Sequence, residues 1–405
     1  MEGRKDQERA AELRAADREC GESQARDAPN ACAAAAQAAS LPADPIAAVN
    51  PSFAATAVRE PPKPAYAALD LGTNNCRLLV ARPSRRGFKV IDAFSRIIRL
   101  GEGVSASGRL SDAAIERTIE ALQVCAAKIE RHRVVRSGLI ATEACRLAGN
   151  GLEFLERARS ETGLDIQIVD RETEAKLAVS GCASLIDFAC DFALVFDIGG
   201  GSSELIWLDL SRHKHLWRRS LAERLEVQRC ITAWTSLPVG VVTLAERFGG
   251  RFVNRATFDA MVAHVVDLLT PFESEHGLRH RLCHGDSHLL GTSGTVTTVA
   301  GVHMRLPRYE RNRVDGCWLD ISEVRAVTDG LLDASYEQRV AEPCIGRERA
   351  DLVLAGCAIL EAMLRMWPCK RLRVADRGLR EGILATLMAE DGVYRSERRS
   401  GYWRR

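Results

Sequence analysis

Short apolar runs that alternate with stretches of helical spacing predict an α/β protein from Ala65 onward. Ala65 to Leu71 is typical of a small apolar strand and Cys76 to Ala81 of a second one, with a polar turn at Gly72 to Asn75 between them. After Ser111, a favourable helix cap, apolar residues recur every three or four positions through Ile129. This spacing predicts an amphipathic helix that follows the two strands.

A second strand–turn–strand unit begins at Phe192. Phe192 to Phe196 predicts a strand that runs into a glycine-rich turn, and Glu204 to Leu208 predicts the returning strand. Because the same order opens the chain at Ala65, the pattern indicates a duplicated α/β architecture. Further predicted elements are strand 138–141, strand 166–169, helix 255–270, strand 289–290, helix 349–366, strand 372–374 and helix 379–389.

The two ends of the chain do not share this pattern. Residues 1–27 are rich in charge, residues 31–39 are nearly all alanine, and prolines follow up to residue 64. Few large apolar side chains are available there to offset the entropy of ordering, so we expect residues 1–65 to form a disordered tail. Residues 392–405 are rich in arginine and predict a second, basic tail.

The composition is that of a globular protein without a strong charge. The 405 residues include 56 Lys and Arg against 54 Asp and Glu, a formal net charge of +2, which argues against nucleic acid or a membrane surface as the partner. The 13 cysteines form no CxxC pair, which favours a reducing compartment. No segment approaches the roughly 20 apolar residues of a membrane helix, and the N-terminal residues lack the apolar core of a signal peptide. We therefore expect a cytoplasmic protein.

The first candidate site for chemistry is the turn after the first strand. Asp70 ends the strand, and Gly72, Thr73, Asn74 and Asn75 follow it. Glycine allows a close approach of the backbone, and short polar side chains supply hydrogen-bond donors, which suits a phosphate group beside a metal ion. The same residues also form ordinary hairpin turns, so the turn alone leaves both interpretations open.

The glycine-rich turn after Phe196 carries a stronger signal. Three consecutive glycines leave several backbone N–H groups free to point at one anion. Asp197 and Glu204 flank the turn, and carboxylate oxygens are the ligands that Mg²⁺ prefers. A purely structural turn does not need both acids.

A third loop, Gly291 to Thr295, leads from a strand into a helix. Glycine and hydroxyl residues at a helix N-terminus form a ready anion site. The alternative is a capped helix with Thr292 or Ser293 as the cap.

Together these loops match the phosphate motifs of the actin, sugar kinase and heat-shock chaperone superfold. Within it the chain resembles the exopolyphosphatase/guanosine pentaphosphate phosphatase family from about Ala67 to Glu390. The resemblance rests on segments that occur in the family's order and spacing: AALDLGTNNCRLLVA, ATEACRLAGN, IVDRETEAKLAVSG, VFDIGGGSSELI, SLPVGVVTLAERF, GTSGTVTTVAG, RVDG, RERADLVLAGCAIL and VADRGLREGIL.

This resemblance implies a general base and a cation for the substrate. The family's catalytic glutamate, which activates the attacking water, falls on Glu174, and its phosphate-contacting arginine falls on Arg146. Without the resemblance, Glu172 is an equally plausible base at the same predicted helix start.

The resemblance also implies metal and phosphate sites. Asp197 and Glu204 correspond to the metal- and phosphate-linked acids, and we add Asp70 to them as a metal ligand. Mg²⁺ is the expected ion, with Mn²⁺ as the alternative. The expected substrate-binding residues are Asn74, Gly199, Gly200, Gly201, Ser202, Gly294 and Thr295, beside Arg146.

The expected architecture is two ribonuclease H-like domains of the actin-like ATPase type, which face each other across a cleft. Domain I is predicted over residues 66–185, with the final helix, 379–391, returning to it, and domain II over residues 186–376. The resemblance is to a short form of the family, without the C-terminal helical domain of longer members.

The expected function is hydrolysis of the terminal phosphoanhydride of inorganic polyphosphate. The alternatives are a guanosine pentaphosphate 5′-phosphohydrolase of the stringent response, a kinase or ATPase of the same superfold, and a non-catalytic sensor of guanosine tetra- or pentaphosphate. Intact Glu174, Asp197 and Glu204 argue against the sensor, because a binding protein needs no base. For the assembly, we consider a homodimer.

Overall fold

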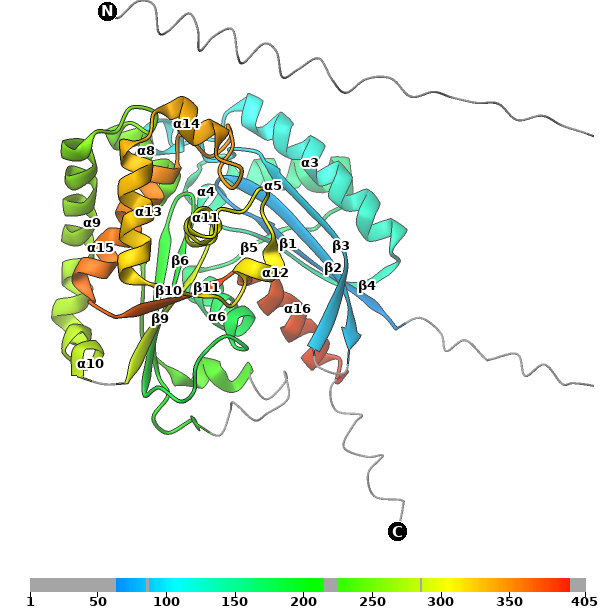
Figure 1. Ribbon diagram of the computed structural model, residues 1–405. Coiled ribbons are helices and arrows are strands. Elements are labelled where there is room, and N and C mark those ends of the chain that lie inside the picture. Colours follow the sequence, from blue (N-terminus) through cyan, green and yellow to red (C-terminus); the bar gives the residue numbers. More distant parts are fainter. Residues whose placement is uncertain (1–62, 85–86, 215–224, 285, 394–405) are drawn as a thin grey trace, which may run out of the picture. The chain divides into compact units, whose positions relative to one another are not determined.

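The computed structural model describes residues 63–84, 87–214, 225–284 and 286–393 (Figure 1). The N-terminal tail predicted over residues 1–65 lies outside the described residues, apart from residues 63–65, as does the basic tail after residue 393. Within the described ranges no helix has both the length and the apolar character to cross a membrane.

The first sheet is built around a hairpin of β1 (Ala65–Leu71) and β2 (Asn75–Ser84). β3 (Gly87–Ile97) adds to β2 antiparallel, and β4 (Val134–Ala141) adds to β1 parallel. With β5 (Gln167–Ile168) beside β4, the strand order is β3-β2-β1-β4-β5.

The second sheet repeats this plan. β6 and β7 form an antiparallel hairpin, β8 extends it antiparallel, and β9 adds to β6 parallel. The order is β10-β11-β9-β6-β7-β8, so the predicted duplicated α/β architecture is confirmed. These strands are β6 (Phe192–Ile198), β7 (Ser203–Asp209), β8 (Ile231–Leu237), β9 (Ser287–Thr292), β10 (Trp318–Asp320) and β11 (Arg371–Ala375).

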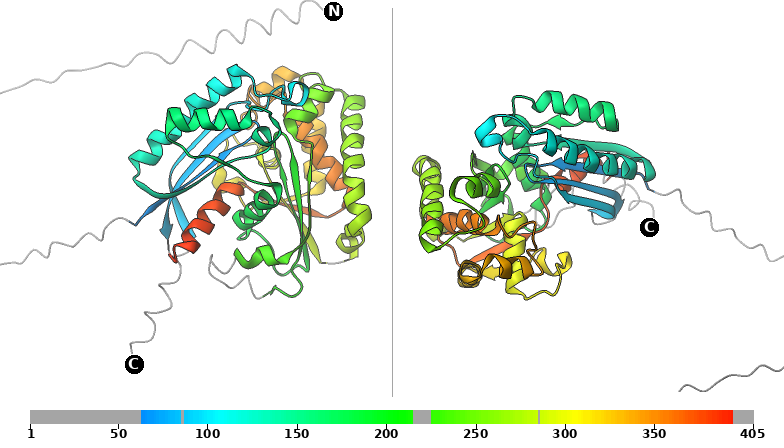
Figure 2. Two further views of the ribbon diagram at one scale, coloured as in Figure 1. Left: turned by 180° about the vertical axis from the view of Figure 1, so that it is seen from behind. Right: turned by 90° about the horizontal axis from the view of Figure 1, so that it is seen from above.

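Alternating residues of β1 bury two faces of the first sheet. Ala67, Leu69 and Leu71 pack with residues of α3 (Asp112–Arg131) and α5 (Gly151–Thr162). Tyr66 and Ala68 instead pack with α16 (Leu379–Glu390), the last helix of the described chain. Because side chains alternate along a strand, one short apolar run therefore supports helices on both sides. The left view of Figure 2 shows α16, in red, beside the strands of this sheet.

The second sheet is covered in the same way. Leu194, Phe196 and Ile198 of β6 belong to the large core that includes α9 (Arg255–His276) and α15 (Val353–Met366). Ala193 and Val195 face the opposite way and pack with α6 (Arg171–Cys182). The predicted helix 349–366 begins later, at Val353, because the preceding residues form a turn that bonds back to Gly346.

The helices α6 and α16 meet where the two halves of the fold join. A Cβ atom on Gly382 of α16 would lie 2.0 Å from the carbonyl oxygen of Leu177, and one on Gly181 of α6 would lie 1.8 Å from that of Gly378. Only glycine allows this approach, and α6 is thereby fixed against both sheets. The remaining helices are α2 (Val104–Ser107), α4 (Glu143–Leu147), α8 (Val241–Phe248), α10 (Leu278–His284), α11 (Gly294–His303), α12 (Arg311–Val314), α13 (Ile321–Asp333), α14 (Tyr336–Ala341) and the 3-10 helix Leu225–Cys230.

Candidate functional site

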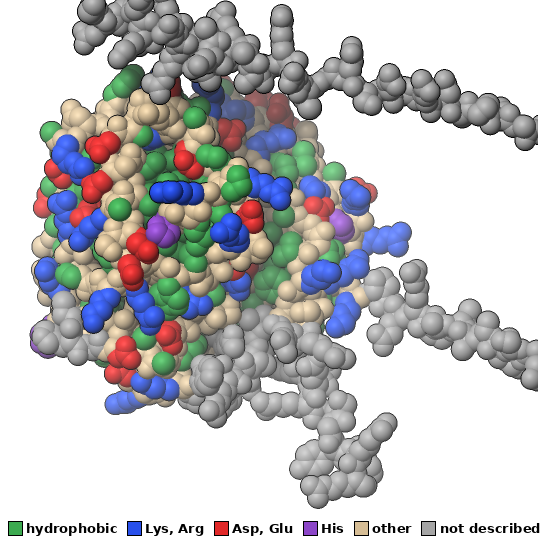
Figure 3. Space-filling view, in the orientation of Figure 1, with side chains coloured by type: hydrophobic (Ala, Val, Ile, Leu, Met, Phe, Trp, Pro, Cys, Tyr) green, Lys and Arg blue, Asp and Glu red, His purple; other side chains and the backbone are tan. Residues whose placement is uncertain are grey.

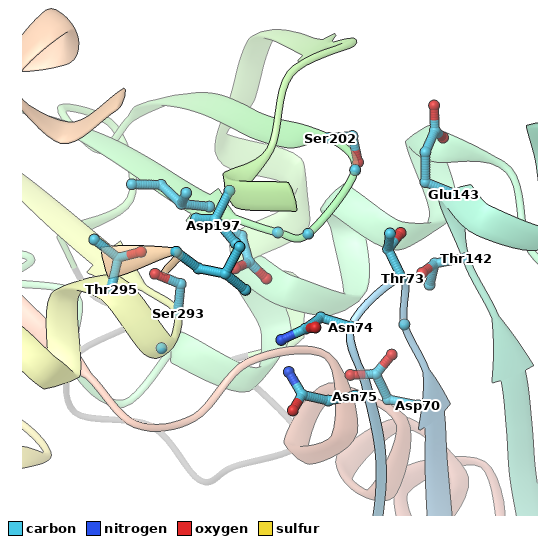
Figure 4. A pocket seen from close by; sticks show the side chains of 18 of the residues that line it. Asp70, Thr73, Asn74, Asn75, Thr142, Glu143, Asp197, Ser202, Ser293 and Thr295 are labelled. Carbon is cyan, nitrogen blue, oxygen red and sulfur yellow. The ribbon is translucent and has the colours of Figure 1, made fainter. Parts of the chain in front are cut away.

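A cavity of about 140 Å³ lies where the turns of the two hairpins face each other (Figure 4). A Cβ atom on Gly200 would lie 2.9 Å from the Cβ of Thr73, so the two turns are in contact. The sequence-predicted residues that line this cavity are Asp70, Asn74, Glu174, Asp197, Gly199, Gly200, Gly201, Ser202, Glu204, Gly294 and Thr295. The fold thus brings all the predicted site residues except Arg146 to one cavity wall.

The turn of the first hairpin is held by its own backbone and by the segment after β3. The Gly72 N–H donates to the Asn75 carbonyl at 2.9 Å, and the Asn74 carbonyl accepts from the N–H groups of Ile98 and Arg99 at 2.9 and 3.0 Å. The Asn74 side-chain oxygen is buried and has no hydrogen-bond partner among the described residues. A buried acceptor of this kind is available to a ligand in the cavity.

The turn of the second hairpin is held by the start of α8. The carbonyl oxygens of Gly199 and Gly200 accept hydrogen bonds from Val241 and Val242 at 2.9 and 2.8 Å. Within the described chain, the N–H groups of Gly200 and Gly201 donate no hydrogen bond to the protein. They are therefore free to bind an anion, as the three glycines predict.

The third loop places a helix N-terminus at the cavity. Ser293 caps α11, where its side chain accepts from the Val296 N–H at 3.5 Å, and Gly294 and Thr295 line the wall. The capping interpretation with Ser293 is confirmed, and the capped helix directs its first turn at the cavity, where an anion site stays a prediction.

Glu174 and Glu172, which the residues alone left as equal candidates, are separated by the structure. Both lie in the first turn of α6, whose cap Asp170 accepts from the Thr173 N–H at 2.7 Å. Glu174 lines the cavity, whereas Glu172 is exposed and bonds Lys176 at 2.6 Å. The helical rotation between the two positions decides which carboxylate faces the cavity.

Arg146, the predicted phosphate ligand, lies beside the cavity and bonds three protein acceptors. Its guanidinium donates to Glu174 at 2.8 Å, to Glu143 at 2.9 Å and to the Val169 carbonyl at 2.6 Å. Arg146 is not among the residues that line the cavity. One of its three partners, Glu143, is a buried acid that lines the cavity and that the sequence did not reveal as part of the site.

Five carboxylates line the cavity, and they belong to Asp70, Glu143, Glu174, Asp197 and Glu204. Burial raises the pKa of Asp197 to about 7, and the charges of Glu174 and Asp70 add to the rise. Burial raises the pKa of Glu174 to about 8, with Glu204 adding to this and Arg146 opposing it. Burial and the charge of Asp197 raise the pKa of Glu204 to about 7. Like charges at close range favour either a bound proton or a bound cation.

The donor set suits a hard cation that arrives together with phosphate. Among the described residues, no three His, Cys, Asp or Glu side chains are grouped tightly enough to hold a metal ion alone. Mg²⁺, however, usually takes one or two carboxylates and completes its shell with phosphate oxygens and water. Asp70, Asp197 and Glu204 line the cavity, and one or two of them would supply the carboxylates of such a site.

A larger groove of about 890 Å³ adjoins the cavity and shares Asp70, Arg77, Asp197 and Arg349 with it. Seven arginines line the groove together with five acids, Asp70, Asp197, Glu348, Asp376 and Glu381, and acidic and basic side chains are also interspersed over the face in Figure 3. Within the described chain, the side chain of Arg77 makes no hydrogen bond, although Arg77 lies opposite Asp70 in the hairpin. Sequence reasoning missed Arg77, and its signal was the register that places it opposite Asp70. The arginines of the groove are Arg77, Arg96, Arg311, Arg347, Arg349, Arg377 and Arg380.

Comparison with known proteins gives a consistent result. The sequence model of the Ppx/GppA phosphatase family matches residues 79–391. The crystal structure of the Aquifex aeolicus member of that family is 29% identical, with a TM-score of 0.63 over 81% of this chain and 98% of that chain. An exopolyphosphatase-like protein is 26% identical, with a TM-score of 0.68 over 81% of this chain and 99% of that chain. An exopolyphosphatase from Cytophaga hutchinsonii, at 21% identity, shares the fold with a TM-score of 0.69 over 80% of this chain and 98% of that chain.

Proposed function

The chain belongs to the Ppx/GppA phosphatase family, and we propose that it is an exopolyphosphatase that removes terminal phosphates from inorganic polyphosphate. The observation that carries this proposal is the continuity of the acidic cavity with the arginine-lined groove through Asp70, Arg77, Asp197 and Arg349. A linear polyanion needs one place for its scissile end and a cationic path for the rest of the chain. The cavity and the groove supply both.

In the proposed mechanism the terminal phosphate binds between the two hairpin turns. The free N–H groups of Gly200 and Gly201 donate to its oxygens, and the hydroxyl of Ser202, which donates to Glu204 at 2.7 Å, lines the same wall. Hydrolysis of a phosphoanhydride requires positioning and charge neutralisation more than covalent chemistry. Rigid backbone donors provide the positioning.

Glu174 is proposed to accept the proton of the attacking water. A carboxylate base is most effective when its pKa lies near the working pH, and burial raises the pKa of Glu174 to about 8. Arg146 favours the ionised carboxylate, which is the form that can accept a proton. The proton leaves the water for Glu174 as the new P–O bond forms and the bridging P–O bond to the next phosphate breaks. Orthophosphate is released, and the shortened polyphosphate is the leaving group and departs toward the groove.

Asp70, Asp197 and Glu204 would hold Mg²⁺, or Mn²⁺ as the alternative. When bound, the ion would neutralise charge on the phosphoryl oxygens and on these carboxylates. It would also lower the pKa of the surrounding acids and keep Glu174 ionised at neutral pH.

The experiment is a phosphate-release assay with polyphosphates of several lengths, guanosine pentaphosphate and ATP. Glu174→Gln should lower turnover by about 100-fold or more, as expected for loss of a general base, while Glu172→Gln stays within a few-fold of wild type. Near-normal turnover of Glu174→Gln would refute its role as base. Faster hydrolysis of guanosine pentaphosphate than of every polyphosphate would refute the substrate assignment.

A further inference from the structure

Two short helical segments beside the cavity carry matching pairs of charges. Helix α4 presents Glu143 and Arg146, and helix α6 presents Arg171 and Glu174, each pair three residues apart. Across the two helices Arg171 bonds Glu143 at 2.6 Å, and Arg146 bonds Glu174 at 2.8 Å. We call these four residues the charge square.

Arg146 is the member that joins the two acids. Its Nε donates to Glu143, one terminal nitrogen donates to Glu174, and the other donates to the carbonyl of Val169, just before α6. A guanidinium is planar and rigid, so three bonds in different directions fix its orientation. The first turn of α6, with Glu174 on it, is therefore held against α4.

Glu143 is the anchor of this arrangement. Its side chain is 3% exposed, and one carboxylate serves both Arg146 and Arg171. Burial alone would raise the pKa of Glu143, but hydrogen bonds from Arg171 and Arg146 outweigh it and hold the pKa below its usual value. An ionised carboxylate is thus maintained at a place where water is scarce.

Glu143 also lies where the two hairpin turns meet. A Cβ atom on Gly201 would lie 3.3 Å from the Cγ of Glu143 and 2.9 Å from the hydroxyl of Thr73. In Figure 4 its carboxylate points away from Asp70 and Asn75, along the flank of the cavity. The acid is therefore adjacent to the proposed phosphate site, but it is directed at the arginines and not at the metal-binding acids.

We propose that Glu143 is a positioning residue, which fixes the guanidinium of Arg146 so that Arg146 holds the Glu174 carboxylate toward the cavity. Arg171 supports Glu143 from the solvent side, where its side chain is 41% exposed. The inference rests on the proposed function of Glu174 as base. It gives Arg146 the task of orienting Glu174.

The test uses steady-state kinetics of the full chain on polyphosphate. Glu143→Gln keeps the shape of the side chain and removes its charge, so Arg146 loses its fixed orientation. We expect kcat to fall by about 10-fold or more while KM changes by less than about 3-fold, because an interaction that orients the base acts on the chemical step. Glu143→Asp, which keeps the charge, should recover part of the lost kcat.

Coupling to Glu174 separates positioning from general stability. In a Glu174→Gln background the further change Glu143→Gln should cost less than about 2-fold in kcat, because the base that it positions is already absent. An equal loss in both backgrounds would overturn the proposal. Arg171→Gln, at an exposed position, should lower kcat in the same direction by a smaller factor, which keeps the test valid if Glu143→Gln fails to fold.

A matched control exists on α15. Glu361 also bonds two arginines, Arg325 at 3.1 Å and Arg365 at 2.8 Å, and its side chain is 13% exposed. Glu361→Gln should lower the melting temperature and leave kcat unchanged. If Glu174→Gln is inactive while Glu143→Gln has a normal kcat, the positioning role alone is refuted. If Glu174→Gln itself is active, the base assignment in the proposed function is what fails.

Discussion

The two hairpins at the cavity share one backbone plan but differ in the charges that face each other across their strands. In the first hairpin Asp70 pairs with Arg77, and in the second Asp197 pairs with Glu204 at the corresponding place. Opposite charges across a strand pair are favourable, and like charges directly opposite are unfavourable. In the first hairpin the charge of Arg77 opposes the rise that burial causes in the pKa of Asp70, whereas in the second the charge of Asp197 adds to the rise in the pKa of Glu204.

The turns of the two hairpins differ in a related way. The first contains one glycine and two side chains that can bond, and the second contains three glycines and presents backbone. In the proposed function the first hairpin offers Arg77 to the substrate, and the second offers Asp197 and Glu204 to a metal ion. Two hairpins with the same backbone plan are therefore expected to differ in function, because their side chains differ.

The largest expected effect comes from removing the charges of the second hairpin. Asp197→Asn and Glu204→Gln should each lower turnover by about 100-fold or more, or raise the Mg²⁺ concentration required, because each loses a hard oxygen charge. Asp70→Asn should cost about 10-fold, since Arg77 already offsets Asp70. Turnover measured against Mg²⁺ concentration checks this order. The control is Asp209→Asn, at the far end of the second hairpin, and its turnover should stay within a few-fold of wild type. A larger loss of turnover for Asp70→Asn than for Asp197→Asn would contradict the comparison of the two hairpins.

Removing the cation of the first hairpin should affect binding more than chemistry. Arg77→Gln is expected to raise KM by about 10-fold with kcat within a few-fold, because a partly buried arginine contributes to charge-assisted binding of the phosphates beyond the scissile one. The measurement is kcat and KM on polyphosphate at low and physiological salt. Arg255→Gln, whose arginine pairs with Asp329 on the surface, should leave both unchanged. A loss confined to kcat would assign Arg77 to the chemical step instead.

The turns should tolerate an added methyl group unequally. A Cβ atom on Gly200 would lie 2.9 Å from Thr73 and 3.2 Å from the Asn74 nitrogen, whereas one on Gly72 would lie 3.4 Å from the Asn75 carbonyl. Gly200→Ala should therefore destabilise the protein by about 1–3 kcal/mol, as overpacking does, and reduce activity several-fold. Gly72→Ala should be nearly neutral. Thermal unfolding and turnover of both variants test this, and equal behaviour would show that the turns are not in tight contact.

The smallest expected effect is on the pH dependence of stability. The folded-state pKa of Asp197 is about 7, and the unfolded value is about 3.9. Between these values the folded protein binds more protons than the unfolded chain, so the contribution of Asp197 to stability falls as pH rises from about 4 to about 7. Without metal, the Asp197→Asn variant should lack the loss of stability that Asp197 causes as the pH rises. Its melting temperature at pH 8 should therefore be a few degrees above that of the wild type. Calorimetry at pH 5 and pH 8 measures the melting temperatures of both proteins. If the wild type gained stability relative to the variant between pH 5 and pH 8, the predicted direction would be wrong.

Much of the fold follows from local signals. Ser111 caps its helix as predicted, the apolar runs at Ala65 and Phe192 form the paired strands, and the glycine turns lie at their ends. Side chains alternate along a strand and recur every 3.6 residues in a helix, so burial leaves a pattern that can be recognised without knowing the partner. Boundaries were less predictable: the helix expected over 255–270 continues to His276, because Pro271 is accommodated within it.

The sequence by itself therefore determined the two hairpins, their three candidate phosphate loops and the acids that flank them, because these signals lie within a few residues of one another. Only the tertiary structure decided that Glu174 and not Glu172 faces the cavity, and that Arg146 is held by a buried acid three residues earlier in the chain. These contacts depend on the distance and rotation between α4 and α6, which are set by packing against two sheets. A charge pattern on one helix does not reveal which charges on another helix it will meet.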